Sequence, residues 1–253
     1  MTAETKKEQI DALQRDGFVV VRGLMPVREC ALVRERAQAQ LAAAKAPLER
    51  EADLQYPGAP ASASAPGGGT VRRLLDAYGR DPAFAAFATS ADVRGWMTTY
   101  FGEQVLLSRA HHNCMMTKHP RYGSLTGWHR DARYWSFERD DLVSAWFALG
   151  DETENNGALW LIPGSHRPDF ASRSFDDAKF FRDDLPENQD MIRRAASPAL
   201  AAGDVVFFHC NTLHAAGKNL SDQTKFSLVY TYHGVSNAPK PGTRSASRPE
   251  IPV

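Results

Sequence analysis

Four short apolar or alternating runs in the second half of the chain constrain the fold more than any other feature. They are QVLLSRAHHNCMMTK, LVSAWFALG, GALWLIPG and GDVVFFHC, and Gly, Pro, Asn and Asp residues separate them. Runs of this length between turn residues predict the strands of an all-β sandwich or barrel, not alternating β-α units. We therefore expect a β-barrel core in this part of the chain.

The N-terminal part has a helical pattern instead. A short helix is predicted near residues 6–15, where Gly17 should end it, and FVVVRGL then predicts a buried strand. Pro26 begins a second predicted helix that extends to about Lys45, and residues 71–99 predict an interrupted helical region. Helices followed by strands predict a mainly β fold with α-helices packed against its core.

Length and composition set the broad class of the protein. We expect one domain over residues 1–253, with N-terminal helices over about 1–100, the β core over about 101–235 and a tail over 236–253. Lys plus Arg and Asp plus Glu are both 30, so no basic field predicts a nucleic-acid or membrane partner. Three scattered cysteines, with no signal-peptide pattern and no long apolar run, predict a soluble cytoplasmic protein. No pattern specifies an oligomeric state.

One segment, YPGAPASASAPGGG at Tyr56–Gly69, is rich in small residues and structure breakers. Such a composition predicts a flexible surface loop, and a mobile lid is the alternative.

The stretch GWHRDARYW contains His129 and Asp131 with one residue between them. If residues 126–131 are extended, both side chains point to the same face and share one metal ion. Two histidines and one carboxylate are the ligand set of many non-haem Fe(II) enzymes. Spacing alone does not identify the second histidine, and an isolated His-x-Asp pair is a weak signal.

Several segments together resemble the phytanoyl-CoA dioxygenase family in order and spacing. They are DGFVVVRGL, WHRD, SAWFAL, ENNGALWLIPGSHR and AGDVVFFHCNTLHAAGKN, and the resemblance extends from about Asp16 to Tyr232. It implies a double-stranded β-helix, which is a cupin-like jelly roll, and an Fe(II)- and 2-oxoglutarate-dependent oxygenase.

The resemblance also implies a set of site residues. His129, Asp131 and His214 match the iron ligands, with His209 as the rival for the third position. Because Asp131 is present, halogenation is not expected, and the implied reaction is hydroxylation of an unactivated C–H bond with O2, releasing succinate and CO2. Desaturation, ring closure and epimerisation remain open. The turn PGSHR is expected to be structural, and His112 is either a core residue or a substrate contact.

Three further residues are implied at the 2-oxoglutarate site. The family usually has an arginine eleven residues after its distal histidine, but this chain has Lys225 there. Lysine supplies the charge without the bidentate geometry of arginine. Lys225 is therefore either the partner of the distal carboxylate or a solvated strand residue. Lys118 is either a second 2-oxoglutarate contact or a loop lysine, and Trp146 is a pocket wall, a core residue or both.

The substrate is expected to be a small molecule. Aromatic residues and arginines near the predicted iron strand suit an anionic compound, although they equally suit core and surface positions; they are Trp128, Arg133, Tyr134, Trp135 and Arg109. Two other functions use the same ligands: a zinc-dependent hydrolase of small molecules, and a barrel that binds a ligand without turnover. The departure at Lys225 keeps the second alternative open.

Overall fold

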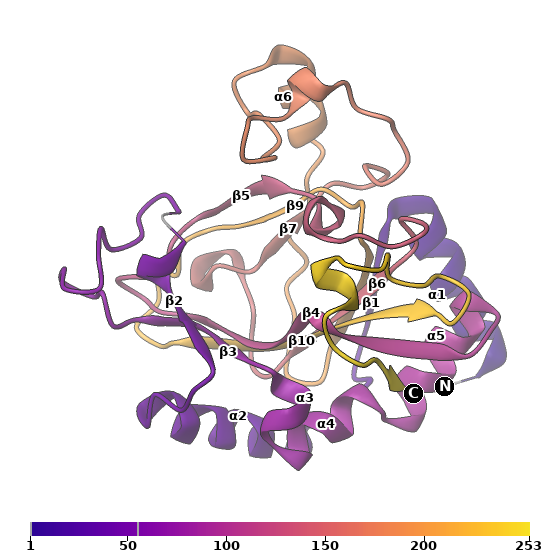
Figure 1. Cartoon of the computed structure of the whole chain (residues 1–253), viewed down its shortest axis with the longest axis horizontal. Helices are drawn as coiled ribbons and strands as arrows, with labels where there is room; N and C mark the ends of the chain where they lie inside the picture. The colour runs from indigo at the N-terminus through magenta and orange to yellow at the C-terminus, as the bar shows by residue number, and fades with distance from the viewer. Residues whose placement is uncertain (1, 55) are drawn as a thin grey trace.

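The computed structural model describes residues 2–54 and 56–253, and its core is two antiparallel sheets that face each other (Figure 1). The larger sheet has the order β1-β8-β6-β10-β4-β3-β2, with β11 beside β4, and the smaller has the order β5-β9-β7. The strands are β1 (Phe18–Val21), β2 (Leu48–Arg50), β3 (Val71–Leu75), β4 (Val105–Lys118), β5 (Thr126–His129), β6 (Val143–Ala148), β7 (Leu159–Leu161), β8 (Val205–His209), β9 (His214–Ala216), β10 (Lys225–Gly234) and β11 (Ile251–Pro252).

Within the described ranges, no strand of one sheet pairs with a strand of the other. The core is therefore an open two-sheet jelly roll. The predicted mainly β, jelly-roll fold class is confirmed, whereas the closed barrel is wrong because the sheet edges do not join.

Helices cover the outer face of the larger sheet, where α2, α3 and α4 lie side by side in Figure 1. Their bounds are α1 (Ala3–Asp16), α2 (Val27–Ala42), α3 (Ala77–Arg80), α4 (Pro82–Ala88) and α5 (Ala91–Phe101), and α6 (Pro186–Ile192) lies beyond the smaller sheet. As predicted, Gly17 ends α1: its φ of 83° is in the left-handed region, and its N–H donates to the carbonyl of Leu13. No helix in the described ranges is long and apolar enough to cross a membrane.

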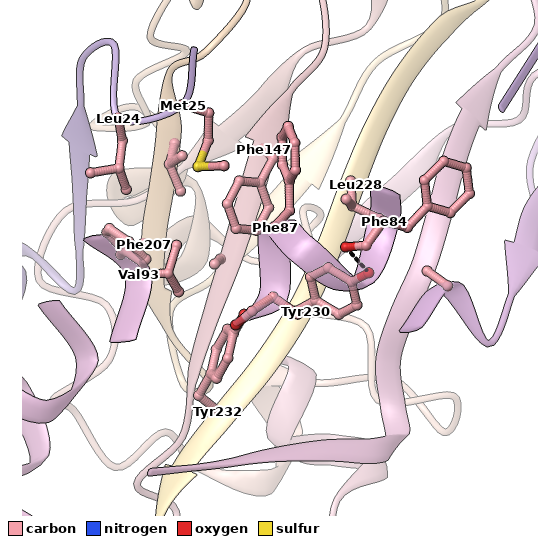
Figure 2. Close-up of a cluster of buried hydrophobic side chains, with 14 of the residues drawn as sticks. Leu24, Met25, Phe84, Phe87, Val93, Phe147, Phe207, Leu228, Tyr230 and Tyr232 are labelled. Carbon is pink, nitrogen blue, oxygen red and sulfur yellow. Dashed lines mark hydrogen bonds between the residues drawn. The ribbon is translucent and has the colours of Figure 1, made fainter. Parts of the chain in front are cut away.

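The main core lies between these helices and the larger sheet (Figure 2). The Trp96 ring of α5 stacks on Phe207 of β8 with centroids 3.9 Å apart, and the Tyr230 hydroxyl of β10 donates to the Phe84 carbonyl of α4 at 2.8 Å. Every residue of β10 is buried, because helices cover one face of this central strand and the smaller sheet covers the other.

Three local predictions need correction. The predicted helical region over 71–99 begins with a strand, because Val71–Leu75 pairs with β4 before α3 starts. The predicted buried strand β1 is only half-buried over its first three residues, since it lies at the edge of the larger sheet. The predicted extended segment ends at Arg130, one residue early, because a 3₁₀ turn begins at Asp131.

Candidate metal centre

His129, Asp131 and His214 come together at one end of the smaller sheet. His129 is the last residue of β5 and His214 the first of β9, and the antiparallel pairing of these strands sets the two residues directly opposite each other. Their ring centroids are 4.2 Å apart. Asp131 reaches the same point because Arg130, between His129 and Asp131, is extended, with φ −107° and ψ 139°, which puts side chains two residues apart on the same side.

The distances among the three side chains suit one metal ion. Asp131 Oδ1 lies 3.8 Å from His129 Nε2 and 3.6 Å from His214 Nε2, and one ligand atom from each residue falls within 4.8 Å of the others. Ligand atoms at such separations can all contact a first-row divalent ion, whose bonds to nitrogen and oxygen are about 2.1 Å long.

Backbone hydrogen bonds orient both imidazoles. His129 Nδ1 donates to the Gly127 carbonyl at 2.9 Å, and His214 Nδ1 donates to the Thr212 carbonyl at 3.0 Å. With the proton held at Nδ1, each Nε2 presents its lone pair to Asp131, as a metal-binding histidine requires.

The electrostatics keep the ligands in their metal-binding forms. Burial, and then the neighbouring His214, lower the pKa of His129 well below its ordinary value, and burial likewise lowers the pKa of His214. Burial raises the pKa of Asp131, but the charges of His112 and His214 lower it by more. The net pKa is therefore below its ordinary value, and the carboxylate is ionised. Among the described residues, buried Asp131 Oδ2 has no hydrogen-bond partner, which suits an atom that binds a metal ion.

His112 is the other polar residue at this centre. It lies on β4 in the larger sheet, and its Nε2 is 2.9 Å from Asp131 Oδ1. His112 was expected to be either a core residue or a substrate contact. In the structure its ring contacts the carboxylate of Asp131. The rival His209 is not part of the cluster, because its Nδ1 accepts from the backbone N–H of Asn211 and its ring packs against His166. Residues 163–166 form a turn, in which Ser165 Oγ accepts from the backbone N–H of Leu213 and donates to the carbonyl of Ile162.

A small pocket of about 30 Å³, which we call the cation pocket, adjoins the metal centre. Its lining includes Lys118, Lys225 and Trp146, all three of the residues predicted for the 2-oxoglutarate site, together with Arg72. Lys118 and Lys225 face each other in the antiparallel register of β4 and β10. Neither is a solvated lysine, since their exposed fractions are 7% and 9%.

Buried acids accompany these cations. Lys225 Nζ donates to Glu152 Oε2 at 2.8 Å, and Arg72 donates to Glu51 Oε2 at 3.2 Å. Burial, followed by the charges of Arg72 and Lys225, lowers the pKa of Lys118 from its ordinary value to about 7.

The family model of phytanoyl-CoA dioxygenase matches residues 13–227, which is most of the chain. The chain belongs to the phytanoyl-CoA dioxygenase family. The family predicted from the sequence is therefore confirmed, and with it the enzyme class, an Fe(II)- and 2-oxoglutarate-dependent dioxygenase.

Similar proteins agree with this assignment. An ectoine dioxygenase of Stutzerimonas stutzeri (strain A1501) is 26% identical over 249 residues, covering 91% of this chain and 78% of that protein. The structure of the epimerase SnoN from nogalamycin biosynthesis superposes with a TM-score of 0.76 at 23% identity, over 95% of this chain and 87% of SnoN. The structure of EctD from S. alaskensis with 2-oxoglutarate and 5-hydroxyectoine has a TM-score of 0.74 at 23% identity, and the match covers 98% of this chain and 82% of EctD.

A second cavity, larger than the cation pocket at about 240 Å³, joins the metal centre to the surface. Of the five residues predicted near the substrate, Tyr134 and Trp135 line it. The other three do not: Trp128 packs in a separate apolar cluster, Arg109 pairs with Asp76, and Arg133 donates to the carbonyls of Ala178 and Lys179.

The loop predicted over Tyr56–Gly69 contains no helix or strand. Its first residue lines the cavity: the Tyr56 ring packs edge-on against Phe180 with centroids 5.5 Å apart, and its hydroxyl lies 3.3 Å from that of Tyr134. One end of the loop is thus anchored beside the metal centre.

Sequence reasoning missed the polar residues that β2, β3 and the turn after β6 contribute. Arg72 and Arg73 lie on β3, in a segment predicted as helix, and Glu49 on β2 pairs with Arg73 at 3.0 Å. Glu152 lies in the turn-like segment GDETENNG, where a charged residue is expected to face solvent. No pattern in the sequence marks Arg72 and Glu152 as buried, or Arg73 and Glu49 as half-buried.

Proposed function

We propose that this enzyme hydroxylates a C–H bond of a small molecule, with His129, Asp131 and His214 as the ligands of Fe(II). The observation that carries the proposal is the three-residue cluster whose Nε2 and carboxylate atoms converge while both Nδ1 atoms are held by carbonyls. Bound Fe(II), together with 2-oxoglutarate and O2, supplies the oxidising chemistry and releases succinate and CO2.

The protein's own residues bind the metal ion and the 2-oxoglutarate and orient them. The two imidazoles and the carboxylate would hold the ion from one side, and all three residues line the larger cavity. Lys118, Lys225 and Arg72 line the cation pocket, which would hold the distal carboxylate of 2-oxoglutarate, since an unpaired buried carboxylate is costly. Trp146 lines both cavities and forms a wall between the metal centre and the cation pocket.

We also propose an anionic group on the substrate. Arg73 and Arg244 line the larger cavity, and Arg244 is exposed with no ion-pair partner in the described ranges. The volume of about 240 Å³ favours a compact substrate. We keep a cytoplasmic location as part of the proposal, which the three buried free cysteines support. Membership of a dioxygenase family favours this function over the zinc hydrolase and the non-catalytic barrel.

The test uses purified protein under anaerobic conditions with Fe(II) and 2-oxoglutarate. We expect the visible charge-transfer band of the chelate in the wild type, its loss in His214→Ala, and its retention in the matched control His209→Ala. On admission of O2, only the proteins with the band should form succinate. A wild type that binds iron but shows neither the band nor succinate would refute the proposed function.

A further inference from the structure

Glu152 is a buried carboxylate behind the wall of the cation pocket, bonded to two of the residues that line it, Lys225 and Trp146. It is 0% exposed and accepts hydrogen bonds from three donors. Trp146 Nε1 lies 3.1 Å from each of its oxygens, Ser227 Oγ donates to Oε1 at 2.6 Å, and Lys225 Nζ donates to Oε2 at 2.8 Å. These three donors fix the carboxylate in place.

Lys225 is already engaged by this carboxylate. Its ammonium also lies 3.3 Å from Ser227 Oγ and 5.0 Å from the centre of the Trp146 ring. Moving Lys225 away to bind another anion would leave Glu152 buried without a counter-ion, and breaking such a pair is strongly unfavourable. Lys225 and Glu152 therefore behave as one neutral unit.

Arg72 is neutralised in a similar way. Its guanidinium donates to Glu51, to Ser124 Oγ at 2.8 Å and to Thr126 Oγ1 at 2.8 Å, and Ser124 in turn donates to Glu51 at 2.6 Å. Because Glu51 pairs with Arg72, this network supplies no net charge to the pocket, although Arg72 Nε and Glu51 Oε1 have no hydrogen-bond partner among the described residues.

Lys118 is the cation that remains. In the described ranges its ammonium has no hydrogen bond and no ion pair, although its side chain is buried. The pairs Lys225–Glu152 and Arg72–Glu51 each carry no net charge, so Lys118 leaves the pocket with one positive charge. A single carboxylate would balance that charge. The lowered pKa of Lys118 agrees with a buried cation that lacks its anion.

We propose that Glu152 is a specificity-determining residue: it engages Lys225 as its counter-ion, so that Lys118 alone neutralises the distal carboxylate of 2-oxoglutarate. The inference rests on the proposed function. It assigns Glu152 a role in setting the pocket for a 2-oxo acid with one distal carboxylate, and it makes Lys225 a positioning residue that acts through Glu152.

The test measures the Kd of 2-oxoglutarate by calorimetry on anaerobic Fe(II)-loaded protein. We expect Lys118→Met to raise the Kd about 100-fold, as loss of a buried charged partner does. Lys225→Met should raise it about tenfold, because Glu152 then repels the ligand, and Glu152→Gln should lower it. The double variant Glu152→Gln/Lys225→Met should return to within about threefold of the wild type. Exposed Lys240→Met is the control and should match the wild type.

The outcomes separate the two proposals. If the wild type binds 2-oxoglutarate but the double variant stays as weak as Lys225→Met, Lys225 is itself the anchor and this inference is overturned while the proposed function stands. An increased Kd in Glu152→Gln would overturn it as well. If Lys225→Met fails to fold, the double variant and Lys118→Met still decide the question. A wild type that binds no 2-oxoglutarate would refute the proposed function, and this inference with it.

Discussion

The affinity for 2-oxoglutarate should fall steeply as the pH rises above 7, because the lysine assigned to the distal carboxylate must be protonated to bind it. Burial, and then the charges of Arg72 and Lys225, lower the pKa of Lys118 from 10.5 to about 7 in the free protein. A bound carboxylate stabilises the protonated form of Lys118 and so raises its pKa towards the ordinary value.

The sign and size of the effect follow from linkage. The complex holds more protons than the free protein between the two pKa values, so binding is strongest below pH 7 and weakens as the pH rises towards the pKa in the complex. Free Lys118 is half protonated at pH 7 and about 1% protonated at pH 9, given a pKa of about 7. The Kd should therefore rise about 50-fold between these values. At pH 8, binding should take up about 0.9 protons.

Calorimetry at pH 6.5 to 9 in buffers with different ionisation enthalpies gives both the Kd and the proton uptake. Lys118→Met is the internal control, and we expect its weaker binding to lose this pH dependence. A wild-type Kd that is flat from pH 7 to 9, or a pH dependence that Lys118→Met retains, would refute the reasoning.

Three further results are expected. Chelation of the metal should lower the Tm by about 5 °C or more, and Fe(II) should restore it, since metal at 100 times its Kd stabilises the folded state by about 2.7 kcal/mol; an unchanged Tm would argue against the site. Tyr230→Phe should lower the free energy of unfolding in urea by about 1–2 kcal/mol, because the Phe84 carbonyl loses its buried donor. Gly157→Ala should weaken 2-oxoglutarate binding, because its φ is 77° and a Cβ would lie 3.2 Å from Lys118 Cε; Gly164→Ala has a similar φ of 73° with open space, so it should lose stability alone.

The sequence predicted much of the strand content correctly, because its signal is local. Apolar runs bounded by turn residues became β4, β6, β7 and β8. The ambiguous case was VRRLL at Val71–Leu75, which has no breaker and suits helix or strand equally. Its pairing with β4 decides its structure, and that contact lies some forty residues away in the chain.

The metal centre was reached by two different routes. His129 and Asp131 are close enough in sequence for their spacing to suggest a site, and the extended backbone assumed between them holds through Arg130. His214 could be chosen over His209 only through the resemblance to a family. The structure gives the physical reason for that choice: β5 and β9 pair in a register that brings His214, and not His209, opposite His129.

The sequence by itself determined the fold class, the family and the set of candidate residues, because these depend on residue types and their order. Only the tertiary structure decided how the charges are paired. Whether Lys225 is free or engaged depends on Glu152, which lies 73 positions away in the chain and is buried only because the turn after β6 folds against β10. Burial and pairing of charges are properties of the packed chain, so the free cation of the pocket, Lys118, could be identified only from the structure.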